Sequence, residues 1–204
     1  MSEHYYSKNP ESKSAEKHWN FTLRGRKISF TTDYGVFSKE EVDYGSRVLI
    51  EAFQSPDIDG DILDMGCGYG PIGIALALHF PDRNIVMVDV NERAIDLAKR
   101  NAVSNQADNT VITASDQYEN IKDRQFAAIL TNPPIRAGKQ VVHSILRQSY
   151  EQLLPDGELW VVIQKKQGAP SARALMEEMF DTVEVAERDK GYYVYKAKKF
   201  DLDN

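Results

Sequence analysis

The sequence has little of several features that would place a protein in a specialised class. Its 204 residues include one cysteine, Cys67, so no internal disulfide can form, and a reducing compartment is compatible with the chain. No apolar run approaches the roughly 18 residues that cross a membrane, and the N-terminus has no apolar signal core. There is no internal repeat or low-complexity segment. These absences predict a cytoplasmic globular protein.

Positive charge and metal-ligand patterns are also scarce. The net charge of -6 argues against a nucleic-acid binder that relies on overall basicity, although a local basic rim is still compatible. No histidine, cysteine and carboxylate residues have metal-ligand spacing, so we predict no metal site. A chain of this length fits one domain that buries about 70% of the surface of its unfolded form. We predict a flexible tail over residues 1–17 and a single domain over residues 18–204.

Glycine is concentrated in one stretch, residues 63–73, which read Leu-Asp-Met-Gly-Cys-Gly-Tyr-Gly-Pro-Ile-Gly. A short apolar strand ends there in an acid, and Pro71 suits the first position of a following helix. Gly68, Gly70 and Gly73 match the Gly-x-Gly-x-x-Gly fingerprint of dinucleotide-binding proteins, so the turn by itself does not choose a cofactor. A turn without Cβ atoms lets bare backbone approach a ligand, which predicts a nucleotide-type site.

The remaining pattern predicts an open α/β sheet. Residues 18–32 alternate as a β-hairpin, and a helix is expected to end near Phe53. Further strands are predicted at 61–64, 85–89, 110–114, 126–131, 158–163, 182–188 and 192–198, with helices at 71–80, 92–103, 139–154 and 171–180. Early strands alternate with helices and a hairpin closes the chain. This order predicts seven strands that are parallel except for one, with helices on both faces.

Acidic residues follow the first three strands of this sheet. In open α/β sheets ligands bind outside the carboxyl ends of the strands, where Asp64, Asp89 and Asp116 are expected. Asp89 lies 19 residues after Gly70, a suitable distance for accepting hydrogen bonds from two ribose hydroxyls. Asp116 is expected to accept a hydrogen bond from an adenine amine. Cys67 is predicted to be a small residue of the turn, so cytosine C5 methylation, which needs a cysteine nucleophile, is unsupported.

Asp64 in the glycine stretch, combined with Asn132-Pro133-Pro134-Ile135 after the fourth strand, resembles the class I S-adenosylmethionine-dependent methyltransferases that modify exocyclic or amide nitrogens. The segments 35–38 (Gly-Val-Phe-Ser), 43–46 (Asp-x-Gly-Ser), 163–171 and 191–194 resemble the small-subunit (16S) ribosomal RNA guanine N2-methyltransferases. The resemblance covers about residues 18–198. It leaves out the N-terminal domain that members of that family can carry, so we expect a single-domain form.

The resemblance implies a seven-stranded class I methyltransferase fold, Rossmann-like, with S-adenosylmethionine as cofactor. The implied cofactor-binding residues are Asp64, Gly66, Gly68, Gly70, Asp89, Asp116, Asn132 and Phe37. The implied catalytic residues are Asn132, Pro133, Pro134 and Ile135. The Asn132 side-chain oxygen and the Pro133 carbonyl would accept both N–H bonds of the target amine and aim its lone pair at the sulfonium methyl. Many nitrogen methyltransferases have an aromatic residue where this chain has Ile135, and Phe37 is a candidate for replacing it.

The resemblance implies that the substrate is 16S ribosomal RNA or the small ribosomal subunit. Cations follow the last strands of the parallel sheet, and such a basic rim fits RNA phosphates held beside an extruded nucleotide. The residues predicted to bind substrate are Phe37, Arg136, Lys139, Lys165 and Lys166, and Arg24, Arg26 and Lys27 of the hairpin are candidates for the same rim. Methylation of another nucleic-acid amine or of a protein glutamine amide stays open. So do an NAD-dependent oxidoreductase and a non-catalytic RNA-binding module. The sequence is compatible with a monomer or a homodimer.

Overall fold

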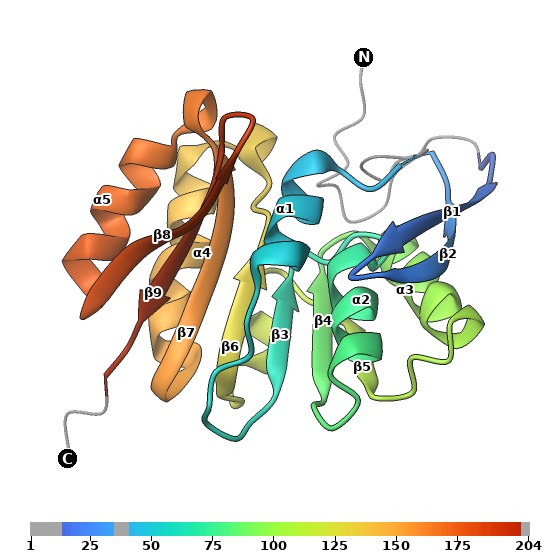
Figure 1. The fold of residues 1–204 in the computed structure, drawn as a ribbon, viewed down its shortest axis with the longest axis horizontal. Helices are drawn as coiled ribbons and strands as arrows, with labels where there is room; N and C mark the ends of the chain where they lie inside the picture. Colours follow the sequence, from blue (N-terminus) through green and yellow to red (C-terminus); the bar gives the residue numbers. More distant parts are fainter. Residues whose placement is uncertain (1–13, 35–40, 201–204) are drawn as a thin grey trace.

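The computed structural model describes residues 14–34 and 41–200. Within these ranges a seven-stranded sheet has the strand order β5-β4-β3-β6-β7-β9-β8 (Figure 1). Its strands are β3 (Ile62–Met65), β4 (Ile85–Asp89), β5 (Thr110–Ala114), β6 (Phe126–Thr131), β7 (Leu153–Gln164), β8 (Thr182–Asp189) and β9 (Tyr192–Lys198). Neighbouring strands pair in parallel except at β9, which is antiparallel to β7 and β8. The predicted seven-stranded sheet with one antiparallel strand is confirmed.

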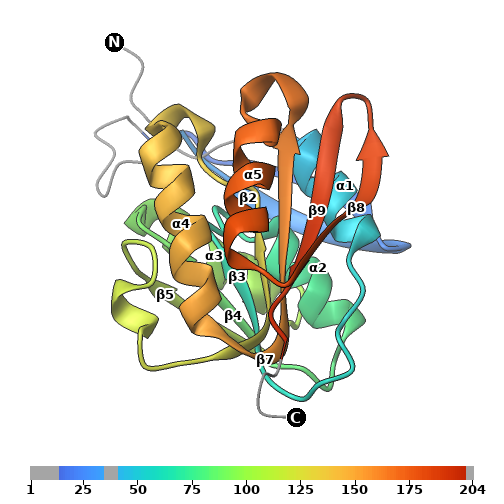
Figure 2. The ribbon, with the colours of Figure 1, turned by 90° about the vertical axis from the view of Figure 1, so that its left-hand side faces the viewer.

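Helices cover both faces of the sheet (Figures 1 and 2). The helices are α1 (Tyr44–Ala52), α2 (Pro71–His79), α3 (Glu92–Ser104), α4 (Lys139–Gln152) and α5 (Ala169–Met179), with 3-10 turns η1 (Glu119–Ile121), η2 (Ile135–Ala137) and η3 (Lys165–Gln167). Consecutive strand residues point to opposite faces, so Ile62 packs in the core beneath α1, α2 and α3, whereas Leu63 packs in the core beneath α4 and α5. Among the described residues, no helix is both long and apolar enough to span a membrane.

Strand β7 begins earlier than the sequence predicts. We expected a helix to residue 154, a Pro-Asp-Gly turn and a strand from residue 158, but α4 ends at Gln152 and β7 starts at Leu153. The predicted Pro-Asp-Gly turn is present as an irregularity within β7. Asp156 has a φ of 62°, and the pairing with β6 shifts between Phe126↔Leu153 and Ala128↔Glu158. Backbone pairing with β6 on both sides of the turn therefore extends the strand beyond the boundary that local sequence indicates.

The predicted N-terminal hairpin is present as β1 (Lys17–Leu23) and β2 (Arg26–Thr32), paired antiparallel. Two asparagines one turn apart, Asn101 of α3 and Asn105 at its C-terminal cap, fasten the free edge of β2. Asn101 accepts from the Thr31 N–H at 2.8 Å and donates to the Thr31 carbonyl at 3.0 Å. Asn105 makes the equivalent pair with Ser29 at 2.9 and 2.7 Å. The amide side chains thus continue the hydrogen bonding of a strand edge that has no further strand beside it.

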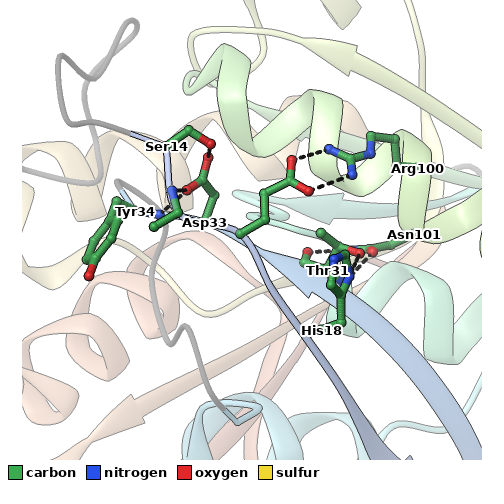
Figure 3. A network of polar contacts seen from close by, with 9 residues as sticks. Ser14, His18, Thr31, Asp33, Tyr34, Arg100 and Asn101 are labelled. Carbon is green, nitrogen blue, oxygen red and sulfur yellow. Dashed lines mark hydrogen bonds and ion pairs between the residues drawn. The ribbon is translucent and has the colours of Figure 1, made fainter.

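The segment before the hairpin also contacts the domain. Asp33 accepts hydrogen bonds from the Ser14 hydroxyl at 2.8 Å and from the Ala15 N–H at 2.6 Å (Figure 3). Arg100 of α3 holds the Glu16 carboxylate through two bonds of 2.6 and 2.9 Å. Most of the predicted flexible tail, residues 1–17, lies outside the described residues, and its described end is held by these bonds. The flexible tail stays a prediction.

Candidate active site

The main cavity lies at the carboxyl ends of β3, β4 and β6. It is lined by the glycine turn, the end of β4, the start of α3 and the Asn-Pro-Pro-Ile segment, with further residues from α1, η3 and β9. Parallel strands end at one edge of a sheet, so segments far apart in the sequence meet there. The structure therefore brings together the two sequence motifs singled out above.

The glycine turn needs glycine for two different reasons. Gly66, Gly68 and Gly70 have φ angles of 76°, 56° and 105°, a region that residues with a Cβ rarely adopt. A Cβ built on Gly66 or Gly68 would meet nothing within 4 Å, so the backbone at these two positions is open to a ligand. A Cβ on Gly73 would lie 2.6 Å from the Met87 side chain. Gly73 thus permits the close packing of α2 on β4.

Asp89 ends β4 and faces the same cavity. Its Oδ2 accepts from the Gly68 N–H at 2.8 Å, and its Oδ1 accepts from the Asn91 N–H at 2.8 Å. Burial raises the pKa of this carboxyl above its ordinary value, and the backbone donors oppose that effect. Each carboxylate oxygen can accept a second hydrogen bond. Asp89 can therefore fix the turn and still accept hydroxyl donors from a ligand.

Asp64 lies beneath the turn and is fully buried. Its Oδ2 accepts from the Gly73 N–H at 2.8 Å, while its Oδ1 is buried without a hydrogen-bond partner among the described residues. Burial raises the pKa of this carboxyl to about 7. Asp64 is not among the residues that line the main cavity, so its contact with a cofactor stays a prediction.

Burial also raises the pKa of the neighbouring Cys67 well above its usual value, which keeps that thiol protonated at neutral pH.

Asn132 comes directly after β6. Its side chain is bound by Asp43, the N-cap of α1, and by Ser46 of α1. Its amide nitrogen donates to Asp43 Oδ2 at 2.7 Å and to the Ser46 hydroxyl at 3.0 Å. An ionised carboxylate can only accept hydrogen bonds, so the group that faces Asp43 must be the NH₂ of Asn132. The Asn132 side-chain oxygen therefore points away from Asp43 and stays available as an acceptor.

The rest of the tetrapeptide borders two adjoining hollows. Pro133 and Ile135 line the main cavity, whereas Pro134 lines a smaller side cavity that shares Gly66, Asp89 and Asn132 with the main one. Arg136 of η2 lines the main cavity. The other predicted cations, Lys139 at the start of α4 and Lys165 and Lys166 of η3, are exposed and do not line it. They follow β6 and β7, which are neighbouring parallel strands, so they lie at the same edge of the sheet.

Asp116 is placed differently from what we expected. It is exposed and lines a third hollow with Tyr118, Lys122 and Gln148, whereas its neighbours Ser115 and Gln117 line the side cavity. The acceptor for an adenine amine therefore stays a prediction at Asp116. Phe37, predicted to contact cofactor and base, lies outside the described residues.

The prediction that the hairpin arginines join the basic rim is wrong. Arg24 donates to the Ile50 and Phe53 carbonyls at 2.7 and 2.9 Å, which caps the C-terminal end of α1. Arg26 donates to the Leu78 carbonyl at 3.2 Å, near the C-terminal end of α2. The cavity is at the opposite ends of these helices, because Ser46 of α1 and Pro71 of α2 line it. Both arginines satisfy helix carbonyls that have no partner within their own helix.

Five residues of the main cavity were given no individual site role from the sequence, namely Asp43, Ser46, Asn91, Gln167 and Tyr192. Asp43, Ser46 and Tyr192 nevertheless belong to segments that resemble the ribosomal RNA enzymes, and the resemblance implies that the loop containing Asp43 and Ser46 lies against the cofactor and the target base. Asp43 and Ser46 also carried a local signal. Asp-x-x-Ser before an apolar helix is a helix-start pattern, and Asp43 is indeed the N-cap of α1, where it accepts from the Ser46 N–H at 3.1 Å. Nothing in the local pattern shows that the same carboxylate reaches Asn132, which lies 89 residues further along the chain.

Comparison with known proteins gives concordant matches. The family described as "Methyltransferase small domain" matches residues 27–196. Protein YbxB of Bacillus subtilis, described as uncharacterized, is 58% identical over 98% of this chain and all of its own length. Ribosomal RNA small subunit methyltransferase C of Actinobacillus pleuropneumoniae is 33% identical over 80% of this chain and 50% of its own. This chain thus spans about half the length of the curated ribosomal RNA methyltransferases that it matches.

A solved structure, the Thermus thermophilus 16S rRNA N2 G1207 methyltransferase in complex with AdoMet and guanosine, superimposes with a TM-score of 0.78. The match has 25% identity and covers 93% of this chain and 52% of that one. A methyltransferase from Pyrococcus furiosus has the same fold, with a TM-score of 0.68 and 18% identity. The predicted class I methyltransferase fold is confirmed, and the chain belongs to the methyltransferase small domain family.

Proposed function

We propose that this protein transfers a methyl group from S-adenosylmethionine to the exocyclic N2 amine of a guanine in 16S ribosomal RNA. The observation that carries the proposal is the juxtaposition of the open glycine turn with Asn132, whose side-chain oxygen is turned away from Asp43. The relatives named for small-subunit RNA methylation and the solved structure with AdoMet and guanosine support this choice of donor and acceptor. The methyltransferase family match does not support the alternative of an NAD-dependent oxidoreductase.

The residues at the turn fit S-adenosylmethionine. At Gly66 and Gly68 a ligand can contact the backbone in the space that a Cβ would otherwise fill. Asp89 can still accept hydrogen bonds from ribose hydroxyls. The side cavity beside β5 is lined by Ser115 and Gln117, which can border an adenine ring. When bound, S-adenosylmethionine supplies a methyl group on a positively charged sulfur. That sulfur is a good leaving group because it departs as a neutral thioether.

Asn132 and Pro133 position the amine. A guanine amine is a poor nucleophile because its lone pair is delocalised into the ring. Acceptance of one N–H bond by the Asn132 side-chain oxygen and of the other by the Pro133 carbonyl favours a pyramidal nitrogen with an available lone pair. Pro134 restricts the backbone of Pro133 and fixes the direction of that carbonyl. The N–C bond forms as the S–C bond breaks, and the amine then loses a proton to water, so no strong base is needed.

Four cations are proposed to hold the RNA around the cavity. Arg136 borders it directly, and Lys139, Lys165 and Lys166 are exposed at the same edge of the sheet. Cations at such a rim can neutralise phosphates on either side of an extruded nucleotide, while the cavity receives the base.

The test is transfer of labelled methyl from S-adenosylmethionine to small ribosomal subunits and to free 16S RNA, both from cells that lack this protein. Digestion to nucleosides should place the label in N2-methylguanosine. Asn132→Ala should lower the rate by about 100- to 1,000-fold. Its effect on binding of S-adenosylhomocysteine, read from protection against thermal unfolding, should be much smaller than its effect on the rate.

Other results would redirect the assignment. Label in an adenine or cytosine amine would keep nitrogen methylation of RNA and change the base. Label in a protein glutamine, with none in RNA, would overturn the RNA substrate. Full activity of Asn132→Ala would overturn the role assigned to Asn132.

A further inference from the structure

The main cavity lacks an aromatic side chain where many nitrogen methyltransferases have one, because Ile135 follows Asn-Pro-Pro. Two aromatic residues are found in the described part of its lining, Tyr69 and Tyr192. Tyr69 is committed to the core. It is 3% exposed, packs against Trp19 and Phe30 with centroid distances of 5.9 and 5.5 Å, and donates its hydroxyl to a backbone carbonyl. Among the described lining residues, Tyr192 is therefore the aromatic residue that can meet a ligand; the earlier candidate Phe37 lies outside the described residues.

Tyr192 is held firmly in place without being enclosed. It is the first residue of β9 and pairs with Gln164 of β7 and Asp189 of β8. A Cβ built on Gly45 of α1 would lie 3.0 and 3.1 Å from two atoms of the Tyr192 ring, so the ring packs directly against that glycine. The ring also contacts the ring of Tyr44, with centroids 5.6 Å apart, and the side chain is half-buried. Packing against Gly45 fixes the ring at the edge of the cavity.

The ring also lies between the motif that positions the amine and the basic rim. Asp43, which orients Asn132, is close enough for its charge to contribute to the raised pKa of Tyr192, although burial is the larger cause. On the other side, the Lys165 N–H donates to the carbonyl of Gly191, the residue before Tyr192, at 2.8 Å. A base placed against this ring would have its amine near Asn132 and its phosphates near η3.

We propose that Tyr192 supplies the aromatic face on which the target base stacks, with Ile135 as an aliphatic wall of the same cavity. This inference rests on the proposed function and names a residue that selects a flat, aromatic acceptor. Loss of stacking on one aromatic side chain weakens nucleic-acid binding by about 5- to 150-fold. The aromatic face thus comes from β9, and an aliphatic residue after Asn-Pro-Pro is compatible with base binding.

The experiment compares Tyr192→Phe and Tyr192→Leu in the RNA methylation assay. Tyr192→Phe retains the ring and should keep kcat/KM within about threefold. Tyr192→Leu should lower kcat/KM for RNA by about 5- to 150-fold, with unchanged affinity for S-adenosylhomocysteine. The control is Tyr193→Leu, since Tyr193 points to the opposite face of the sheet and stacks on Tyr195. Its kcat/KM should stay within about threefold of wild type.

The outcomes separate this inference from the proposed function. Equal kcat/KM for wild type and Tyr192→Leu, with the wild type active on RNA, would overturn the role of Tyr192 alone. A loss in Tyr192→Leu that Tyr192→Phe shares would assign the effect to the hydroxyl and overturn stacking. A wild type that methylates no RNA would overturn the proposed function, and the stacking role would fall with it.

Discussion

Asn132 has one amide orientation that its neighbours accept. Asp43 Oδ2 lies 2.7 Å from the amide nitrogen and can only accept a hydrogen bond. A flipped amide would set two oxygens against each other and take the N–H donor away from the carboxylate. Under the proposed function, Asp43 is therefore a positioning residue, which would act on the substrate amine through Asn132.

Asp43→Asn tests this role without removing the cap of α1, because asparagine and aspartate are about equally good N-caps. A neutral amide no longer dictates the orientation of Asn132, so we expect kcat for RNA methylation to fall by about 10- to 100-fold, in line with the loss of a hydrogen bond to a charged group. Affinity for S-adenosylhomocysteine should not change.

The matched comparison is the same substitution in an Asn132→Ala background. If Asp43 acts through Asn132, Asp43→Asn should then have little further effect. Additive losses would contradict the positioning role. Asp57→Asn, an exposed site before β3, serves as the control and should behave as wild type.

The buried carboxyl of Asp64 should make the stability difference between the wild type and Asp64→Asn depend on pH. Its pKa is about 7 in the folded protein and about 3.9 in an unfolded chain. The stabilisation linked to its proton is therefore fully present below about pH 4 and is lost as the pH rises through 7. Relative to Asp64→Asn, the wild type should lose roughly 2–3 kcal/mol of unfolding free energy between pH 5 and pH 8.

Urea unfolding of both proteins at a series of pH values measures this difference, because most other titrating groups cancel in the comparison. A constant gap between the two curves would show that the Asp64 carboxyl does not titrate in this range. A lowered pKa would instead make the wild type gain on Asp64→Asn as the pH rises through about 4, below this range.

At the scale of elements, the hairpin is fastened to α3 by two asparagines of different burial. Asn101 is 1% exposed, and its amide also donates to the Tyr69 carbonyl at 2.9 Å, beside the glycine turn. Asn105 is more exposed. The position of the hairpin is thus linked to the turn that borders the main cavity.

Asn101→Ala should lower the free energy of unfolding by about 1–3 kcal/mol, because it leaves buried backbone groups without partners. Asn105→Ala is the matched variant and should cost only about 0.5–1.5 kcal/mol, since water can replace its bonds. Chemical denaturation measures both. Equal losses of unfolding free energy in the two variants would contradict burial as the cause of the difference.

At the scale of the whole molecule, the chain is acidic, with a net charge of -6, and has a short cationic segment at η3. Lys165 and Lys166 are exposed there. We expect Lys165→Ala with Lys166→Ala to weaken binding to 16S RNA and to reduce the slope of log affinity against log salt by about 1–2. Lys99→Ala, on the exposed side of α3, should leave the slope unchanged, and an unchanged slope in the double variant would remove η3 from the RNA contacts.

Much of the fold could be predicted because its signals are local. Apolar strands, the glycine turn and the alternating hairpin residues specify elements within a few positions of themselves. The start of β7 could not be predicted, since pairing with β6 extends the strand past a turn signal. The hairpin arginines were misplaced for a related reason. Their charge is visible in the sequence, but the helix ends that they cap come from α1 and α2.

The sequence by itself determined the order of strands and helices, the glycine turn and the presence of Asn-Pro-Pro at a strand end, because each depends on neighbouring residues. The tertiary structure decided which side chains complete the site. Asp43 meets Asn132 and Tyr192 packs on Gly45 across long stretches of chain. Such contacts arise where parallel strands end at one edge of the sheet and a returning hairpin closes it, and no local pattern encodes the distance between two segments after folding.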